Sequence, residues 1–268
     1  PTMIISAETS SGQQIVNNSK TNEQNITLNF VASEDIQNFE QSDISITNGT
    51  LSNFSGSGST YTALFSPTNN ALCTINVSGD FVNNANQKNI QPDLLQFTFD
   101  NVQPTISFIV KNGNNILNNQ HITNLNLFDI IFTLSEEPIN FVASDIIITN
   151  GTVSNFSGSG TQYTAQITIN DNQTCSFNIP AERFTDIAGN QNLASDTFQI
   201  TNDIISPVLT LELKDSNGDI VNDGGESNSN TLQLTITSSE QIINFSSASI
   251  SSTNCEIIEV SNININEY

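Results

Sequence analysis

The sequence predicts an all-β protein made of repeated two-sheet sandwiches of about 100 residues each. The first observation is composition: Asn, Ser, Ile and Thr dominate the 268 residues, with Val, Phe and Gly beside them, which is typical of short strands joined by polar turns. The second is that similar segments recur at a period of 103 residues. The third is that turn residues divide each full copy into seven short runs, which fits a sandwich.

The repeat is visible in two sets of matching segments. Similar stretches begin at Pro1, Pro104 and Pro207, which are 103 residues apart. Ser42 to Thr50 matches Ser144 to Thr152, and Ser-Asn-Phe-Ser-Gly-Ser-Gly follows in both copies. We therefore expect one repeat at 1–103, a second at 104–206 and an incomplete third at 207–268.

Seven strands are expected in the first copy, where the turn signals are plainest. In one of them Ile26, Leu28 and Phe30 alternate with polar neighbours, as a half-buried strand requires. Asn48-Gly49 predicts a two-residue hairpin turn, because both residues tolerate positive φ. The expected strands are 3–7, 25–31, 43–47, 50–54, 60–65, 73–77 and 95–100.

The charge of the chain excludes some classes of partner. Five basic residues stand against 27 acidic ones, a net charge of -22, which repels nucleic acid and anionic membrane surfaces. No apolar run reaches the roughly 18 residues that insertion into a membrane needs. A metal cation is the small partner that such a surface attracts, although the acidic residues would also serve solubility alone.

No residue pattern indicates catalysis, and we expect no enzyme. His121 is the one histidine, and it is expected in a turn between the first two strands of the second copy. Cys73 and Cys175 occupy equivalent strand positions and are predicted to be core residues rather than a disulfide, because a whole domain separates them. Cys255 has no counterpart and is expected to be a free thiol.

Acidic residues gather where two successive sandwiches should meet. The linker, the loop after the second strand and the loop before the last strand lie at one end of such a sandwich, so their oxygens form a candidate site for Ca²⁺. The alternative is that these side chains only cap their own turns. The candidates are Asp100, Asn101, Glu136, Glu137 and Asp186 at the first junction, and Asp203 and Glu240, with a loop after Tyr268, at the second.

A further acidic stretch runs from Asp215 to Glu226. Its spacing is partly that of an EF-hand loop, but Ile220 stands where that loop needs glycine. A hairpin turn rich in Asp, Asn and Gly is the better interpretation.

Several of these motifs resemble the bacterial Ig-like repeats of giant surface adhesins. They are Ser-Glu, Asn-Phe, Ser-Asp-Ile, Thr-Asn-Gly-Thr and Phe-Ser-Gly and, in the second copy, the run from Asp186 to Asn190. The first copy departs from the pattern at this last motif, with Asn83-Asn84-Ala85-Asn86. The resemblance covers the whole chain. It implies seven-stranded, Greek-key immunoglobulin-like sandwiches arranged as a rod, an extracellular or cell-surface location, and frequently calcium at the domain junctions.

The function expected from these observations is mechanical. Tandem repeats would form a stalk or spacer, whose partners are neighbouring Ig-like repeats of the same or an adjacent chain, while the surface target is not identified. Two alternatives remain open from the sequence. One is a subunit of an extracellular filament assembled by strand exchange, suggested by the incomplete third repeat. The other is a module that binds glycans or proteins through its loops.

Overall fold

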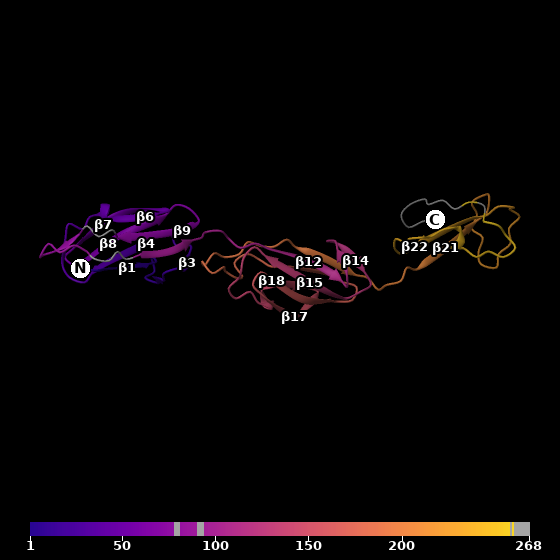
Figure 1. The fold of residues 1–268 in the computed structure, drawn as a ribbon. Helices are drawn as coiled ribbons and strands as arrows, with labels where there is room; N and C mark the ends of the chain where they lie inside the picture. The colour runs from indigo at the N-terminus through magenta and orange to yellow at the C-terminus, as the bar shows by residue number, and fades with distance from the viewer. Residues whose placement is uncertain (78–80, 90–93, 258, 260–268) are drawn as a thin grey trace. The chain divides into compact units, whose positions relative to one another are not determined.

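The computed structural model describes residues 1–77, 81–89, 94–257 and 259 (Figure 1). These residues form β-strands and three short 3-10 turns, and no α-helix occurs among them. In this described part, no helix has the length and apolar character of a membrane span. The chain divides into two compact units, Pro1–Asp203 and Ile204–Tyr268, and the first unit holds two sandwiches.

The first sandwich has a five-stranded sheet in the order β2-β1-β4-β8-β7 and a four-stranded sheet in the order β3-β11-β9-β6. A small two-stranded sheet, β10-β5, accompanies them. The bounds are β1 (Met3–Glu8), β2 (Gln14–Ile15), β3 (Lys20–Thr21), β4 (Ile26–Ala32), β5 (Ile36–Gln37), η1 (Gln41–Asp43), β6 (Ile44–Thr47), β7 (Gly49–Ser57), β8 (Thr60–Pro67), β9 (Ala71–Val77), β10 (Val82–Asn83) and β11 (Leu94–Phe99).

The second sandwich repeats this topology, with sheets β13-β12-β15-β18-β17 and β14-β20-β19-β16. In both sandwiches a short strand pairs in parallel with the last strand, β3 with β11 and β14 with β20. The predicted all-β fold of tandem sandwiches is therefore confirmed. The bounds are β12 (Ile106–Asn112), β13 (Asn115–Leu117), β14 (His121–Thr123), β15 (Leu127–Leu134), η2 (Ala143–Asp145), β16 (Ile147–Thr149), β17 (Gly151–Ser159), β18 (Gln162–Ile169), β19 (Thr174–Asn178) and β20 (Phe198–Asn202).

An aromatic cluster is repeated in the two cores. Phe39 contacts four aromatic rings at centroid distances of 5.1 to 5.7 Å, and Phe141 does the same at 5.0 to 5.9 Å. Such aromatic contacts, most of them edge-to-face, add to the stabilisation from burial. The rings are Phe30, Phe54, Tyr61 and Phe81 around Phe39, and Phe132, Phe156, Tyr163 and Phe184 around Phe141.

The predicted hairpin at Asn48-Gly49 is wrong, because the strands on its two sides belong to different sheets. β6 pairs with β9, whereas β7 pairs with β8, so the chain crosses between the sheets here. Asn48 has the expected positive φ of 55°, and its Nδ2 donates a hydrogen bond of 2.8 Å to the carbonyl oxygen of Leu72. A Cβ on Gly49 would lie 2.2 Å from the ring of Phe65, so this crossing needs glycine.

The tight hairpin of each sandwich joins β7 to β8 and β17 to β18. The pairing of β17 with β18 shifts register between Ser154 and Ser157, where Asn155 has a φ of 51°. Gly158, with a φ of 154°, lies so close to the neighbouring strand that a Cβ would be 2.4 Å from the carbonyl oxygen of Gln162. The bulge and the glycine together fix this hairpin.

His121 and two of the three cysteines lie within the sandwiches. His121 begins the short strand β14 and is half-buried, so its predicted place in a turn is wrong. Cys73 and Cys175 are buried free thiols in the two cores, as expected, and Cys255 is exposed.

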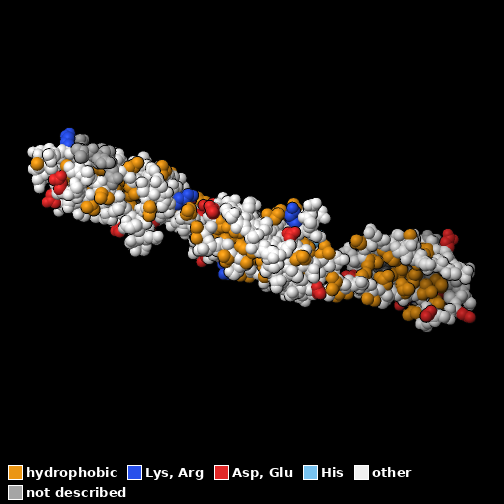
Figure 2. Space-filling view, turned by 60° about the horizontal axis from the view of Figure 1, so that its bottom comes forward, with side chains coloured by type: hydrophobic (Ala, Val, Ile, Leu, Met, Phe, Trp, Pro, Cys, Tyr) orange, Lys and Arg blue, Asp and Glu red, His pale blue; other side chains and the backbone are white. Residues whose placement is uncertain are grey.

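The second unit contains the antiparallel pair β21 (Leu209–Lys214) and β22 (Gln233–Ser238), with η3 (Ser247–Ser249) after it. Leu211 pairs with Ile236 as Phe108 pairs with Phe132 in the second sandwich. Leu211 is nevertheless 67% exposed, and Figure 2 shows hydrophobic side chains gathered on this unit.

The loop at Asp215 is a turn. The carboxylate of Asp215 accepts hydrogen bonds from the backbone N–H groups of Asn217 and Asp219, at 2.8 and 3.0 Å. This agrees with the interpretation of the stretch as a hairpin turn.

Candidate cation site between the two sandwiches

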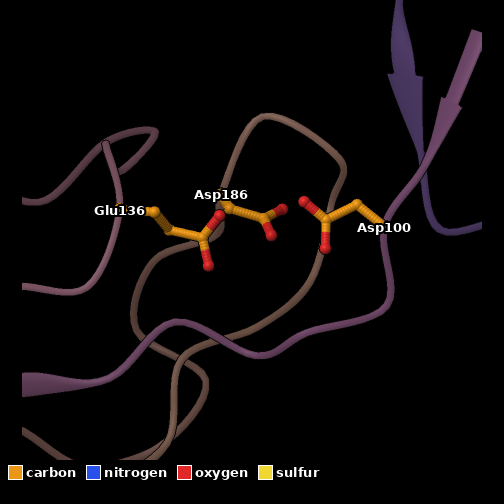
Figure 3. Close-up of side chains that lie close together, drawn as sticks. All are labelled: Asp100, Glu136 and Asp186. Atoms are coloured by element: carbon orange, nitrogen blue, oxygen red, sulfur yellow. The ribbon is translucent and has the colours of Figure 1, made fainter. Parts of the chain in front are cut away.

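Three carboxylates meet where the first sandwich joins the second: Asp100, Glu136 and Asp186 (Figure 3). One oxygen from each lies within 4.8 Å of the others. Asp100 directly follows β11, Glu136 lies two residues after the end of β15, and Asp186 belongs to the loop between β19 and β20. We call these three residues the carboxylate cluster.

The core of the second sandwich positions both of its contributing loops. Phe184, two residues before Asp186, is buried against Phe141 with ring centroids 5.0 Å apart. Leu134, two residues before Glu136, is also buried. Because each carboxylate follows so closely on a core side chain, its position depends on packing inside the sandwich.

Asp186 is 2% exposed, which is costly for a carboxylate unless hydrogen bonds compensate. Its Oδ1 accepts the backbone N–H of Asn190, and its Oδ2 accepts the side-chain Nδ2 of the same residue, both at 2.8 Å. Asn190 also closes the loop, because its carbonyl oxygen accepts the backbone N–H of Asp186 at 3.0 Å. Asp186 is therefore held rigidly.

Asn190 also links the two sandwiches. Its Nδ2 donates to the carbonyl oxygen of Asp100 at 2.8 Å, and its Oδ1 accepts from Nδ2 of Asn22 at 3.2 Å. The backbone N–H of Asn22 donates to the carbonyl oxygen of Ala188 at 3.1 Å. The Asp186–Asn190 loop thus contacts both the linker and the first sandwich. Asn190 was part of the motif identified in the sequence, but nothing in the sequence marked Asn22.

The charge at this junction is negative. Lys20 forms an ion pair of 3.5 Å with Asp100, and among the described residues it is the cation that offsets the three carboxylates. Burial raises the pKa of Glu136, and the negative charges of Asp186 and Asp100 raise it further, while Lys20 acts in the opposite direction. Glu136 therefore resists ionisation unless a positive charge compensates.

The donor set fits a hard cation. All three side chains offer carboxylate oxygens, which Ca²⁺ binds in sets of six to eight together with carbonyl groups and water. Nitrogen and sulfur donors, which zinc sites use, are missing from the carboxylate cluster. The residues present can thus hold a divalent metal ion.

The other predicted ligands are placed differently. Glu137 is exposed and lies outside the carboxylate cluster. Asn101 is also exposed, and its backbone N–H donates to Oδ1 of Asn70 at 2.8 Å. Asp203 and Glu240 belong to different units, so the second junction stays a prediction.

Comparison with known proteins gives a family match. Residues 8–93 and 100–202 match the model of the family described as Bacterial Ig-like domain. No curated protein matches the chain at a significant level.

Solved structures give weaker likenesses. The structure of Yersinia pseudotuberculosis InvD is similar at 14% identity and a TM-score of 0.35, over 89% of this chain and 69% of that one. The C-terminal domain of the Streptococcus agalactiae AgI/II polypeptide BspA is similar at 9% identity and a TM-score of 0.34, over 74% and 99%.

Proposed function

Because the chain belongs to the bacterial Ig-like domain family, we propose that it is a structural stalk segment of a bacterial surface protein. The observation that carries this proposal is the junction made by Asn190, which hydrogen-bonds the loop of one sandwich to the linker and, through Asn22, to the preceding sandwich. Bonds of this kind would let each module support the next. The stalk would be extracellular and non-enzymatic, with neighbouring Ig-like repeats as its partners.

Calcium is the second part of the proposal. Asp100, Glu136 and Asp186 would bind Ca²⁺ at the junction, and the ion would offset the mutual repulsion of the three carboxylates. Two of these ligands belong to the second sandwich, and the third begins the linker. Binding would therefore stabilise the junction as well as the fold.

Thermal unfolding in calcium and in a chelator tests the metal. We expect Ca²⁺ to raise the Tm of the full chain, and Asp100→Asn to remove most of that rise. Glu137→Gln is the matched control, since Glu137 is the exposed neighbour of Glu136 and should leave the response unchanged. An equal Tm in both solutions would remove calcium from the proposal.

The mechanical part has its own test, which is small-angle X-ray scattering of the full chain. The maximum dimension of a stalk segment should not change with protein concentration. Ca²⁺ should narrow the range of molecular dimensions that fits the scattering curve. Scattering that requires many different arrangements of the two sandwiches in Ca²⁺ would contradict a junction at which one sandwich supports the next.

A second candidate function, assembly by strand exchange, is favoured by the exposed apolar side chains of β21 and β22, which are Leu209, Leu211 and Leu234. β22 corresponds to β15 of the second sandwich, which pairs with β12 on one side and with β18 on the other. Among the described strands, β22 pairs only with β21, so its other edge has no partner strand there. Such an open edge accepts strands. Sedimentation velocity should then show association of the full chain that Leu211→Glu abolishes, and a monomer at all concentrations would exclude this candidate.

A further inference from the structure

We infer that the residue at the position of Asp186 decides whether the end of a sandwich needs a cation, so that calcium acts at some junctions of the repeat array and not at others. The inference rests on the proposed calcium site, but it concerns residues of this chain whose contacts are described in both sandwiches. Position 83 of the first sandwich corresponds to position 186 of the second, 103 residues later. The first has Asn83, and the second has Asp186.

In the first sandwich this loop satisfies itself by hydrogen bonds. Asn83 is 4% exposed, and its Nδ2 donates to Oε2 of Glu34 at 3.1 Å and to Oε1 of Gln87 at 2.9 Å. Its Oδ1 accepts the backbone N–H groups of Ala85 and Gln87, at 3.0 and 2.9 Å. Every polar atom of this buried amide has a partner, and the glutamate opposite it receives a donor.

In the second sandwich the residue at the equivalent position, Asp186, has no N–H group to donate to the glutamate opposite it. Asp186 is as buried as Asn83 and accepts two hydrogen bonds from Asn190, but an ionised carboxylate has nothing to donate. Glu136, which corresponds to Glu34, therefore faces the negative charges of Asp186 and Asp100 instead of an amide. Lys20 offsets only part of this negative charge, so a further cation would complete the compensation at this end of the sandwich.

The difference involves a pair of residues. Asn83 needs an acceptor for its Nδ2 and finds it in Oε1 of Gln87. Asp186 needs a donor and finds it in Nδ2 of Asn190. Asn83 with Gln87, and Asp186 with Asn190, are two pairs that each satisfy the hydrogen bonds of the same loop. A variant that carries the residue of the other sandwich must therefore exchange both members of the pair.

The experiment exchanges these pairs in the full chain. The variant Asp186→Asn/Asn190→Gln carries the pair of the first sandwich, and Asn190→Gln alone is its control, because that change removes the contacts of Asn190 with Asn22 and Asp100. Calorimetric unfolding is measured in EGTA and in Ca²⁺, and Ca²⁺ binding is measured by isothermal titration.

We expect the double variant to bind Ca²⁺ at least tenfold more weakly than Asn190→Gln and to unfold at a higher temperature than that control in EGTA. Equal Ca²⁺ affinity in the two variants, or a lower Tm of the double variant in EGTA, would overturn the inference. If the wild-type chain shows no response to Ca²⁺, the calcium proposal fails, while the comparison in EGTA still decides whether position 186 sets the need for positive charge.

The reciprocal exchange gives a second readout that does not depend on the native junction. Asn83→Asp/Gln87→Asn places a buried carboxylate opposite Glu34 in the first sandwich. It should lower the Tm of the chain in EGTA, and Ca²⁺ should recover part of that loss. An unchanged Tm in EGTA would show that the position tolerates either residue without a cation, which contradicts the inference.

Discussion

Asn83 and Asp186 occupy the same position in two successive sandwiches, and only Asn83 donates a hydrogen bond to the glutamate opposite it, at 3.1 Å. Both side chains are almost fully buried, so the difference is one of charge and not of exposure. The surrounding loops are held by equivalent core aromatics, Phe81 and Phe184. The two sandwiches share one fold, but the same end carries a neutral amide in the first and an additional carboxylate in the second.

The pH dependence of stability should report the unfavourable charge of Glu136. Burial and the neighbouring carboxylates raise the pKa of Glu136 from its ordinary value of 4.5, so in the absence of metal the folded state keeps this proton to a higher pH than the unfolded state does. The contribution of Glu136 to the free energy of unfolding is therefore present below pH 4.5 and is lost as the pH rises through the folded-state pKa.

Substitution of Glu136 tests this sign. In EGTA, Glu136→Gln should raise the Tm at neutral pH relative to the wild type, and the difference should shrink as the pH falls below 4.5. Calorimetry across this range measures it, with Glu137→Gln as control. A wild-type Tm advantage at neutral pH in EGTA would contradict the assignment.

Gly158→Ala should destabilise the second sandwich by about 2 to 4 kcal/mol, because the added Cβ would lie 2.4 Å from a backbone carbonyl oxygen. Gly160 is the matched control. It also has a positive φ, 59°, but a Cβ added there would meet nothing within 4 Å, so Gly160→Ala should cost only about 1 to 2 kcal/mol. Urea unfolding measures both, and equal losses would contradict the close approach of the strands.

Phe141→Ala should cost about 3 to 5 kcal/mol of unfolding free energy, as truncation of a buried phenylalanine does. It should also weaken Ca²⁺ binding, since Phe141 packs against Phe184 beside the loop of Asp186. Phe39→Ala removes the equivalent ring from the first sandwich and should cost as much without changing the affinity for Ca²⁺. Unfolding combined with calcium titration separates the two effects, and equal calcium affinities would show that the loop does not depend on the aromatic cluster.

The three thiols should differ sharply in reactivity. Burial raises the pKa of Cys175 to about 11 and also raises that of Cys73, whereas Cys255 is exposed. Iodoacetamide at about pH 8 should therefore modify Cys255 in the native chain, with Cys73 and Cys175 reacting only in denaturant. Peptide mass spectrometry locates the label, and modification of Cys175 under native conditions would show that the core opens.

The sequence predicted the repeated sandwiches correctly, but it did not predict which strands pair with one another. Alternation at Ile26, Leu28 and Phe30 predicted a core-facing strand, because a side chain's face follows from local spacing. The hairpin predicted at Asn48-Gly49 was wrong because positive φ is a local property of these residues. The partner strands of β6 and β7 depend instead on the long-range packing of the two sheets. The carboxylate cluster was predictable from the position of loops in a sandwich. The amide contacts of Asn22 and Asn190 were not, since they depend on how two modules meet.

The parallel pairing of β3 with β11 and of β14 with β20 has a mechanical consequence. In each sandwich the short strand that follows the first two strands, β3 or β14, runs beside the last strand in the same direction. The two are joined by backbone bonds such as Gln120 N–H to the carbonyl oxygen of Gln199 at 2.8 Å. Tension that reaches the short strand from its N-terminal side and the last strand from its C-terminal side would load the hydrogen bonds between them together in shear. A sandwich connected in this way would resist traction through several short-strand bonds that must break together, whereas the bonds of a peeled hairpin would break one after another.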